Sequence, residues 1–238
     1  MSGSAVPRSL LVVAVTGIGE VRPGADLAGL IAEHADLAEG DVVVVTQKIV
    51  SKAEGRLVTV DPDDPADRIR LIEAESVRVL RRRGELLVTE TGHGFVCANS
   101  GVDFSNVESG WAALLPEDPD RSARRIRDGL RAVSGVEVGV IVSDTFGRTW
   151  RQGVIDVAIG CAGVAGVVDL RGSHDALGRE LQATEVCVAD EIASAAELVM
   201  GKASGLPVAV VRGVNPEWLR RGSVADEIVR PASEDLFR

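Results

Sequence analysis

The sequence GDVVVVTQKIVSKAEGR, residues 40–56, changes from apolar to polar within a single residue. Its four consecutive valines, Val42–Val45, predict a strand buried on both faces, because β-branched side chains favour strands and no polar alternation leaves a face for water. Lys48 and Lys52 follow almost directly. Two lysines at the end of a core strand need a reason beyond packing, and the other motifs of the chain offer candidates for it.

The segments around this strand alternate between strand and helix patterns. Apolar runs predict strands, and apolar residues at helical spacing predict helices. We expect strands at residues 10–15, 86–91, 136–144 and 207–214, helices at 26–36, 66–82, 121–133 and 189–202, and strand or tight turn across the glycine-rich residues 154–172. This alternation favours a mixed α/β or α+β fold.

Three consecutive arginines, Arg81–Arg83, fall at the C-terminal end of the helix expected at residues 66–82. Cations at that end of a helix offset its dipole, which is the ordinary explanation of such a run. A role in facing phosphates is the alternative.

Composition limits the class of protein. The chain has 238 residues, which suits one domain spanning residues 1–238, whether or not it divides into two lobes. Its net charge of −10 argues against nucleic acid or an anionic membrane surface as partner. No apolar run reaches the roughly 18 residues of a membrane span, and the N-terminal segment lacks the apolar region of a signal peptide. We therefore expect a cytoplasmic protein, with Cys97, Cys161 and Cys187 as buried, reduced thiols.

A first candidate for a metal ligand is Asp144, which ends the strand expected at residues 136–144 and precedes Thr145. In α/β sheets, ligands are usually bound at the carboxyl ends of strands. A carboxylate beside a hydroxyl suits a hard divalent cation. An aspartate at this position can equally cap a turn or helix, and on this residue alone both interpretations stay open.

A second candidate carboxylate is Asp103, in the polar loop NSGVDFSN of residues 99–106. The glycine of this loop allows close approach of a ligand, although Asx turns alone also explain such a loop. Two separated carboxylates that converge on Mg²⁺ or Mn²⁺, with lysines facing phosphates, would form a phosphoryl-transfer site.

The common nucleotide-binding motifs are absent from the sequence. The chain contains no GxxxxGK[ST] motif, and no GxGxxG follows a strand, so a P-loop fold is not expected. Two short glycine loops lie beside predicted strands, at Gly17–Glu20 and at Gly201–Gly205. Each loop alone is a weak signal, because most glycine loops are turns.

Several longer stretches, taken together, indicate a protein family more specifically than any single motif does. The stretches GDVVVVTQKIVSKAEGR, HGFVCANSGVDFSNV, VIVSDTFGRTWRQGVIDVAIGCAGV, LGRELQATEVCVADEIASAAELVMGK and PVAVVRG resemble, in this order, the coenzyme F420:L-glutamate ligase family. The resemblance extends from about residue 10 to residue 213. Some family members carry an additional C-terminal flavin-binding domain, and this chain is similar to the stand-alone form.

The resemblance implies a GTP-dependent ligase with an α+β fold that is not a P-loop fold and that forms an intertwined homodimer. The terminal phosphoryl group of GTP would activate the lactyl carboxylate of coenzyme F420-0 as an acyl phosphate, which the amine of L-glutamate would then attack. Further rounds would add γ-linked glutamates. The implied cofactors are Mg²⁺ or Mn²⁺, as two ions, and a monovalent cation such as K⁺.

The same resemblance implies the residues of the site. Asp103 and Asp144 are implied as metal ligands, and Thr145 as the ligand of a second ion. Lys52 would meet phosphate charge as a point cation, whereas for Lys48 a solvated surface position is equally expected. The implied nucleotide contacts are Gly17, Ile18, Gly19, Glu20, Gln47, Lys52, Asn106, Met200, Gly201, Lys202, Ala203, Ser204, Gly205, Leu206 and Pro207.

The acceptor pocket is less visible in the sequence. Trp150, Arg148 and Arg151 could bind the deazaflavin or its phosphate by stacking and charge. A buried tryptophan with surface arginines is the alternative. Glu185 and Glu191 could be further metal or base groups, although a carboxylate at a helix start explains Glu191 equally well.

One position departs from the family pattern. Gly19 stands where a proline is expected, which makes the first loop more flexible.

Two other functions stay open. The chain could instead be a metal-dependent amide ligase for another acceptor or amino acid, or a non-catalytic nucleotide-binding module. The joint presence of Asp103, Asp144, Thr145 and Lys52 argues against the non-catalytic module.

Overall fold

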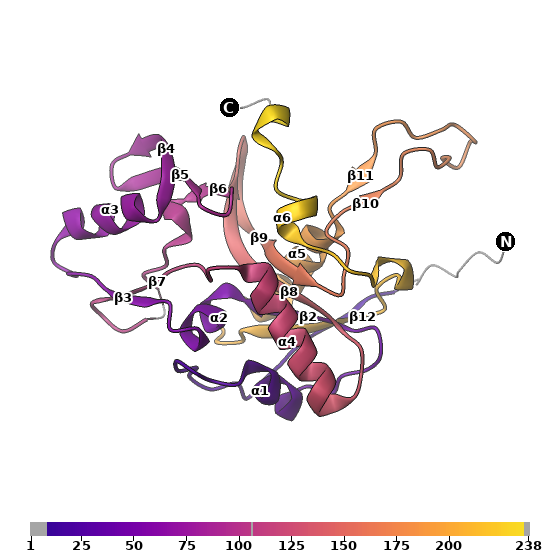
Figure 1. Ribbon diagram of the computed structural model, residues 1–238, viewed down its shortest axis with the longest axis horizontal. Coiled ribbons are helices and arrows are strands. Elements are labelled where there is room, and N and C mark those ends of the chain that lie inside the picture. The colour runs from indigo at the N-terminus through magenta and orange to yellow at the C-terminus, as the bar shows by residue number, and fades with distance from the viewer. Residues whose placement is uncertain (1–8, 106, 236–238) are drawn as a thin grey trace.

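The computed structural model of the chain describes residues 9–105 and 107–235. At its centre is a five-stranded sheet in the order β1 (Leu11–Ala14), β12 (Val208–Arg212), β2 (Val42–Thr46), β8 (Gly139–Arg148) and β9 (Arg151–Ala162). β2 and β8 run parallel, whereas the other neighbours in the sheet are antiparallel. A mixed sheet with helices packed on it confirms the expected α+β class (Figure 1).

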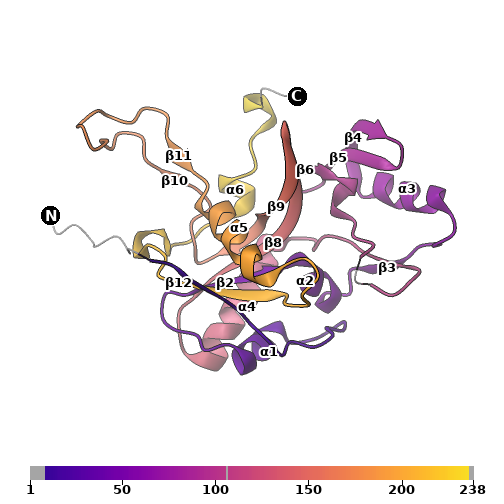
Figure 2. The same ribbon diagram turned by 180° about the vertical axis from the view of Figure 1, so that it is seen from behind.

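The valine strand β2 forms the middle of the core. Each residue of Val42–Val45 is 0% exposed, because helices cover both faces of the sheet. Alternate valines pack with α1 (Leu27–His34) and α4 (Pro119–Ser134) on one face, and with α5 (Val188–Met200) on the other. Figures 1 and 2 show these two layers from opposite sides. The predicted burial of the valine strand on both faces is confirmed.

The polar segment after β2 forms a short helix, α2 (Gln47–Ala53), which the sequence pattern does not predict. The pairing of β2 with β8 ends at Thr46 and Ser143, so α2 begins where both strands reach their carboxyl ends. Gln47 and Lys52 are buried on this helix. The end of the valine strand therefore delivers polar side chains to one edge of the sheet.

A smaller part of the molecule lies beside the central sheet and has its own hydrophobic cluster, which includes Ile72, Leu87 and Leu114. It appears at the left of Figure 1. Its elements are β3 (Leu57–Thr59), α3 (Pro65–Ala74), β4 (Ser76–Arg83), β5 (Leu86–Thr91), β6 (Val96–Ala98), η1 (Asn99–Gly101) and β7 (Trp111–Ala113). β4, β5 and β6 form one sheet, and β3 pairs with β7 in another.

The helix expected at residues 66–82 is wrong in its second half. At Ser76 the chain enters β4, where valines alternate with arginines and the strand pairs with β5. The cross-strand ion pair Arg78–Glu90, at 3.0 Å, stabilises this pairing. Arg81–Arg83 consequently lie in a strand, and the helix-dipole explanation of this arginine run is wrong as well.

The strand expected to end at Asp144 continues as β8 as far as Arg148. The reason is β9, which pairs with it in an antiparallel hairpin that places Asp144 opposite Val157 and Thr145 opposite Asp156. Asp144 therefore lies inside a strand, but one residue beyond the point where β8 leaves its parallel neighbour β2. β9 also accounts for the first half of the segment expected to be strand or turn.

The other predicted helices and strands are present, with boundaries shifted by a few residues. The remaining short elements are β10 (Val168–Asp169), β11 (Glu185–Val186), η2 (Pro216–Trp218), α6 (Val224–Glu227) and η3 (Ala232–Glu234). The β10–β11 hairpin stands out from the body in both views (Figures 1 and 2). The three cysteines are free thiols. Cys97 and Cys161 are buried as predicted, whereas Cys187 is only partly buried. None of the helices among the described residues has the length and apolar character needed to cross a membrane.

Candidate active site

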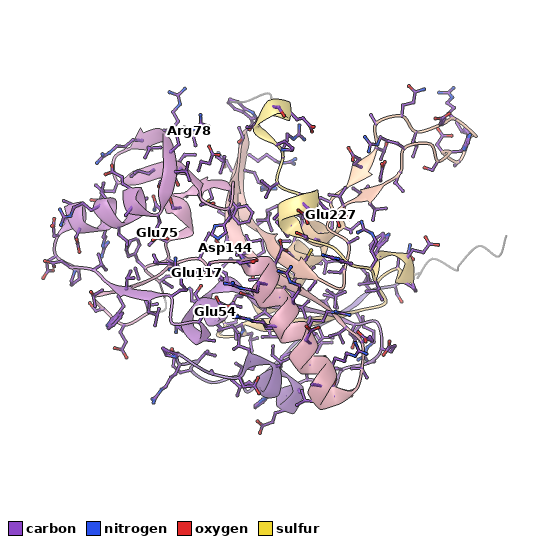
Figure 3. All side chains as sticks on the ribbon, in the orientation of Figure 1. Glu54, Glu75, Arg78, Glu117, Asp144 and Glu227 are labelled. Atoms are coloured by element: carbon purple, nitrogen blue, oxygen red, sulfur yellow. The ribbon has the colours of Figure 1, made fainter. Side chains whose placement is uncertain are left out.

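A cavity of about 640 Å³ lies at the carboxyl ends of β2 and β8. Its wall comes from residues within five segments, 18–21, 46–52, 98–105, 143–156 and 197–207. Neighbouring parallel strands bring their carboxyl ends to the same edge of a sheet, which places the segments after β2 and within β8 here. The antiparallel pairing of β12 with β1 and β2 brings the segments 18–21 and 197–207 to the same edge. In Figure 3, Asp144 lies near the centre of the molecule, where the smaller part meets the central sheet.

This cavity brings together most of the residues that the sequence predicts for the site. Gly17 and Ser204 do not line it, and Asn106 lies outside the described residues. The predicted residues that do line it are Ile18, Gly19, Glu20, Gln47, Lys52, Asp103, Asp144, Thr145, Met200, Gly201, Lys202, Ala203, Gly205, Leu206 and Pro207.

The first glycine loop has two distinct positions. Gly17 has a positive φ of +88° and packs so closely on the ring of His34 that a Cβ atom there would lie 2.5 Å from it. A side chain at Gly19 would meet no other atom within 4 Å. Gly17 is therefore required for the turn, whereas the position where a proline is expected is sterically open.

Asp144 carries an unusual carboxyl group. Its side chain is half-buried in the cavity wall, and burial raises its pKa to about 7, with the nearby charges of Asp103 and Asp156 acting in the same direction. No ion pair is formed by Asp144 in the part of the chain that the structure describes. The strand thus holds a carboxyl group that has no ion-pair partner among the described residues, although the charge of Lys202 acts on it from a distance and lowers its pKa.

Asp103 is held in place by its own loop and by α2. Its carboxylate pairs with Lys48 at 2.8 Å and accepts hydrogen bonds of 2.7 Å from both the backbone N–H and the hydroxyl of Ser105. Burial acts to raise the pKa of Asp103, but Lys48 and Ser105 outweigh it and lower the pKa. Lys48 is therefore a partner of the carboxylate rather than a solvated surface lysine, and the loop also contains the expected Asx turn.

Lys52 faces the first glycine loop across the cavity wall. Its ammonium group lies 2.5 Å from the Glu20 carboxylate, and its side chain is only 9% exposed. An ammonium group has three donors, of which Glu20 uses one, so Lys52 keeps donors for a further anion. Both predicted nucleotide segments are thereby joined by one ion pair.

Asp156 is a residue of the site that the sequence analysis missed. It is 1% exposed and accepts hydrogen bonds from Ser143 at 3.0 Å and Thr145 at 2.7 Å, and it forms an ion pair with Lys202 at 2.6 Å. The available signal was a single carboxylate within the apolar run of residues 154–162, because a buried charge in a core strand requires a partner. Its partner could not be identified from spacing alone.

Negative charge predominates in the cavity. The ionisable groups that line it are Glu20, Asp103, Asp144, Asp156, Glu197, Lys48, Lys52 and Lys202. Carboxylates therefore outnumber ammonium groups, and a polyphosphate would be repelled by this wall unless a cation bound with it.

Asp103 and Asp144 fit a divalent cation of the Mg²⁺ or Mn²⁺ type. Their carboxylate oxygens are the hard ligands that these ions prefer, and Asp144 needs a counter-charge. Among the described residues no three His, Cys, Asp or Glu side chains are grouped to hold a metal ion by themselves. Water and phosphate oxygens would complete the coordination, as is usual for Mg²⁺.

Thr145 does not fit a second divalent ion. Its hydroxyl donates to Asp156 and also accepts a hydrogen bond from the ammonium group of Lys202. A cation already lies at the hydroxyl that the sequence resemblance implies as a metal ligand.

The residues considered for the acceptor or for further chemistry lie outside the cavity. Trp150 is 91% exposed at the tip of the β8–β9 hairpin, so the alternative of a buried tryptophan is wrong. Arg148 donates to the backbone carbonyl of Gln152 in the same hairpin. Glu185 pairs with an arginine of the protruding hairpin, and Glu191 lies in the first turn of α5, as its helix-start explanation requires.

The chain is similar to known proteins over most of its length. The family model described as F420-0:Gamma-glutamyl ligase matches residues 17–213. The protein named coenzyme F420:L-glutamate ligase of Methanopyrus kandleri is 47% identical, with 92% of this chain and 94% of that protein covered. Its namesake from Methanothermobacter thermautotrophicus is 41% identical, with 95% of this chain and 98% of that protein covered. A third, from Methanocaldococcus jannaschii, is 38% identical with 90% of both covered.

Proposed function

Because the chain belongs to the F420-0:Gamma-glutamyl ligase family and is therefore a ligase, we propose that it forms an amide bond between coenzyme F420-0 and L-glutamate. We propose further that GTP activates the lactyl carboxylate of F420-0. Additional rounds would extend the product with γ-linked glutamates.

The observation that carries this proposal is the convergence of the two glycine loops, α2 and two carboxylate-bearing elements on one cavity. Its volume of about 640 Å³ lies within the range of roughly 300–1,000 Å³ typical of small-ligand sites. The wall combines backbone loops, lysine donors and the paired carboxylates Asp103 and Asp144. This combination supports binding of a nucleotide together with a divalent cation.

The proposed reaction has two steps. In the first, an oxygen of the acceptor carboxylate attacks the γ-phosphorus of GTP, the bond from that phosphorus to the bridging oxygen breaks, and GDP leaves with the electron pair. In the second, the amine nitrogen of glutamate attacks the carbonyl carbon of the acyl phosphate. Phosphate then leaves, and the amine proton is released to water.

The side chains of the cavity have separable roles in these steps. Mg²⁺ or Mn²⁺, when bound by Asp103 and Asp144, would supply the positive charge that neutralises the phosphates. Lys48 and Lys52 orient the carboxylates on the two sides of the cavity and keep spare N–H donors for phosphate oxygens. The loop at residues 200–207 lines the cavity beside the first glycine loop, because the strand that follows it, β12, pairs with β1. It would help to exclude water from the activated carboxylate. The monovalent cation expected from the resemblance has no assigned ligand in this proposal.

We also propose that the chain forms a homodimer. The support is apolar surface on the two hairpins that protrude from the body, where Trp150 is 91%, Val154 57% and Leu177 83% exposed. Trp150 and Val154 lie on the same hairpin, and exposed apolar surface of this kind is typical of surfaces that another chain covers. Light scattering with size-exclusion chromatography tests this, and a monomer mass at micromolar concentration would reject it.

The decisive experiment for the activity is a product assay by mass spectrometry. Purified protein is incubated with F420-0, L-glutamate, GTP and Mn²⁺, with Asp144→Asn as the matched inactive variant. Products that gain one or more glutamyl units only with the wild-type chain would support the proposal. GTP-dependent thermal stabilisation without product would indicate another acceptor or amino acid, because a bound ligand raises apparent stability. If neither product nor GTP-dependent stabilisation is observed, the proposal is rejected.

A further inference from the structure

Lys202 occupies an unusual position in the cavity. It follows the last turn of α5 after Gly201, whose φ of 62° turns the chain back toward the sheet. Its ammonium group contacts three acceptors from three elements, the Thr145 hydroxyl on β8, the Asp156 carboxylate on β9 at 2.6 Å and Glu197 on α5 at 3.4 Å. The ammonium group has three donors, so these contacts match its full capacity.

The carboxylate of Asp156 requires this cation. It is 1% exposed, and its other partners are the hydroxyl groups of Ser143 and Thr145. A buried carboxylate needs a counter-charge, and Lys202 is the basic residue that forms an ion pair with it among the described residues. The side chain of Lys202 is 51% exposed, so its contacts are not a consequence of being trapped in the core.

The resemblance implies a second divalent ion at Thr145, and Lys202 stands in its place. A hydroxyl that donates to Asp156 presents its lone pairs to the cation beside it, and that cation is the ammonium group. A divalent ion bound to the same oxygen would lie within a few ångströms of the ammonium group, where like charges repel strongly.

We propose that the ammonium group of Lys202 serves as the second cation of the site, so that the chain binds one divalent ion, at Asp103 and Asp144, instead of two. This inference rests on the proposed function, because it assumes the first ion and the nucleotide. Lysine suits the role as a compact point charge on a long stem. The cation at Thr145 would then be a fixed part of the protein, independent of the metal concentration.

The test is the number of Mn²⁺ ions retained per chain at saturating concentrations of a non-hydrolysable GTP analogue, measured by equilibrium dialysis and electron paramagnetic resonance. The wild-type chain should retain one ion. Lys202→Ala should retain two, because Thr145, Asp156 and Glu197 remain as oxygen ligands without their cation. Lys202→Arg, which keeps the charge, should retain one.

A second variant separates the effect of the Lys202 position on the number of bound ions from the effect of losing any positive charge in the cavity. Lys52→Ala removes one positive charge from the same cavity without touching Thr145, so it should still retain one ion. Circular dichroism of each variant establishes that it is folded. Two ions in the wild-type chain, or a single ion in folded Lys202→Ala, would overturn the inference.

The outcomes also separate this inference from the proposed function. Asp144→Asn should lose the first ion, both as a single replacement and in combination with Lys202→Arg. If the wild-type chain retains two ions and both Asp144 variants lose one, the proposed metal site stands and only the role of Lys202 fails. If the wild-type chain retains no ion with the nucleotide analogue present, the proposed metal site is rejected and this inference with it.

Discussion

The replacement Asp156→Ala is expected to destabilise the fold and not only to affect ligand binding. It leaves the hydroxyl of Ser143, which is 0% exposed, without its acceptor, and an unsatisfied buried polar group costs about 1–3 kcal/mol. Removing one partner of a buried ion pair costs about 3–5 kcal/mol when the other charge stays buried. Lys202 is 51% exposed and regains water, so we expect a total loss of about 3 kcal/mol.

Urea unfolding of the chelated protein without nucleotide measures this loss, because the free energy of unfolding falls linearly with denaturant. The matched control is Asp169→Ala, which removes an aspartate that also pairs with a basic residue, Arg171 at 2.6 Å, but with both side chains 50% exposed. This control should change the free energy of unfolding little, because exposed pairs contribute little. Equal losses for Asp156→Ala and Asp169→Ala would refute the reasoning that burial makes the Asp156 contacts stabilising.

Four further outcomes are expected. Asp144→Asn should lower the rate of glutamyl transfer more than about 100-fold, since a catalytic metal ion contributes several kcal/mol; a rate within tenfold of wild type would remove Asp144 from the site. Lys52→Ala should raise the KM for GTP about tenfold, the equivalent of one charge-assisted hydrogen bond, and an unchanged KM in steady-state assays would mean that Glu20 alone uses this lysine. Chelation of divalent ions should weaken GTP binding in calorimetry, and equal affinity with and without EDTA would contradict the charge argument. Glu227→Gln should destabilise the fold at pH 7, because Arg220 and backbone N–H groups lower the pKa of Glu227 against the effect of burial. The difference in unfolding free energy between wild type and variant should be present above the unfolded pKa of 4.5 and should disappear as the pH falls through the lower folded pKa. A difference that does not change with pH would count against this prediction.

The sequence predicts those parts of the site that local patterns determine. Val42–Val45 are predicted correctly, because a short run of four β-branched residues without alternation favours a strand covered on both faces. Asp144 and the two glycine loops lie beside predicted strands. The pairing of β2 with β8, and of β12 with β1 and β2, then brings them to one cavity. Local patterns fail at residues 76–83, where valines and arginines are compatible with helical spacing and only the pairing with β5 selects the strand.

The roles of Asp156 and Lys202 depend on contacts that no local pattern contains. Asp156 faces Thr145 because the β8–β9 hairpin has a register shift between Val142 and Ser143, and a strand register cannot be read from one strand alone. The resemblance implies Lys202 as part of a nucleotide loop, and the structure also joins it to a carboxylate on β9. Both assignments require knowledge of which side chains face each other across the sheet.

The same hairpin explains why the cavity holds its charges so close together. β8 supplies Asp144 and Thr145 at successive positions, and β9 supplies Asp156 opposite Thr145, so the carboxylates of both strands lie within electrostatic reach of each other. Alternate residues of a strand point to opposite faces, which leaves Asp144 toward the loop of Asp103 and Thr145 toward Lys202. One carboxylate is therefore neutralised within the protein by Lys202, while Asp144 is left for a cation that arrives from solution. Since a bound cation reduces the repulsion that the phosphates meet, metal binding and nucleotide binding must be coupled. By the reciprocity of linkage, the nucleotide strengthens metal binding as much as the metal strengthens nucleotide binding.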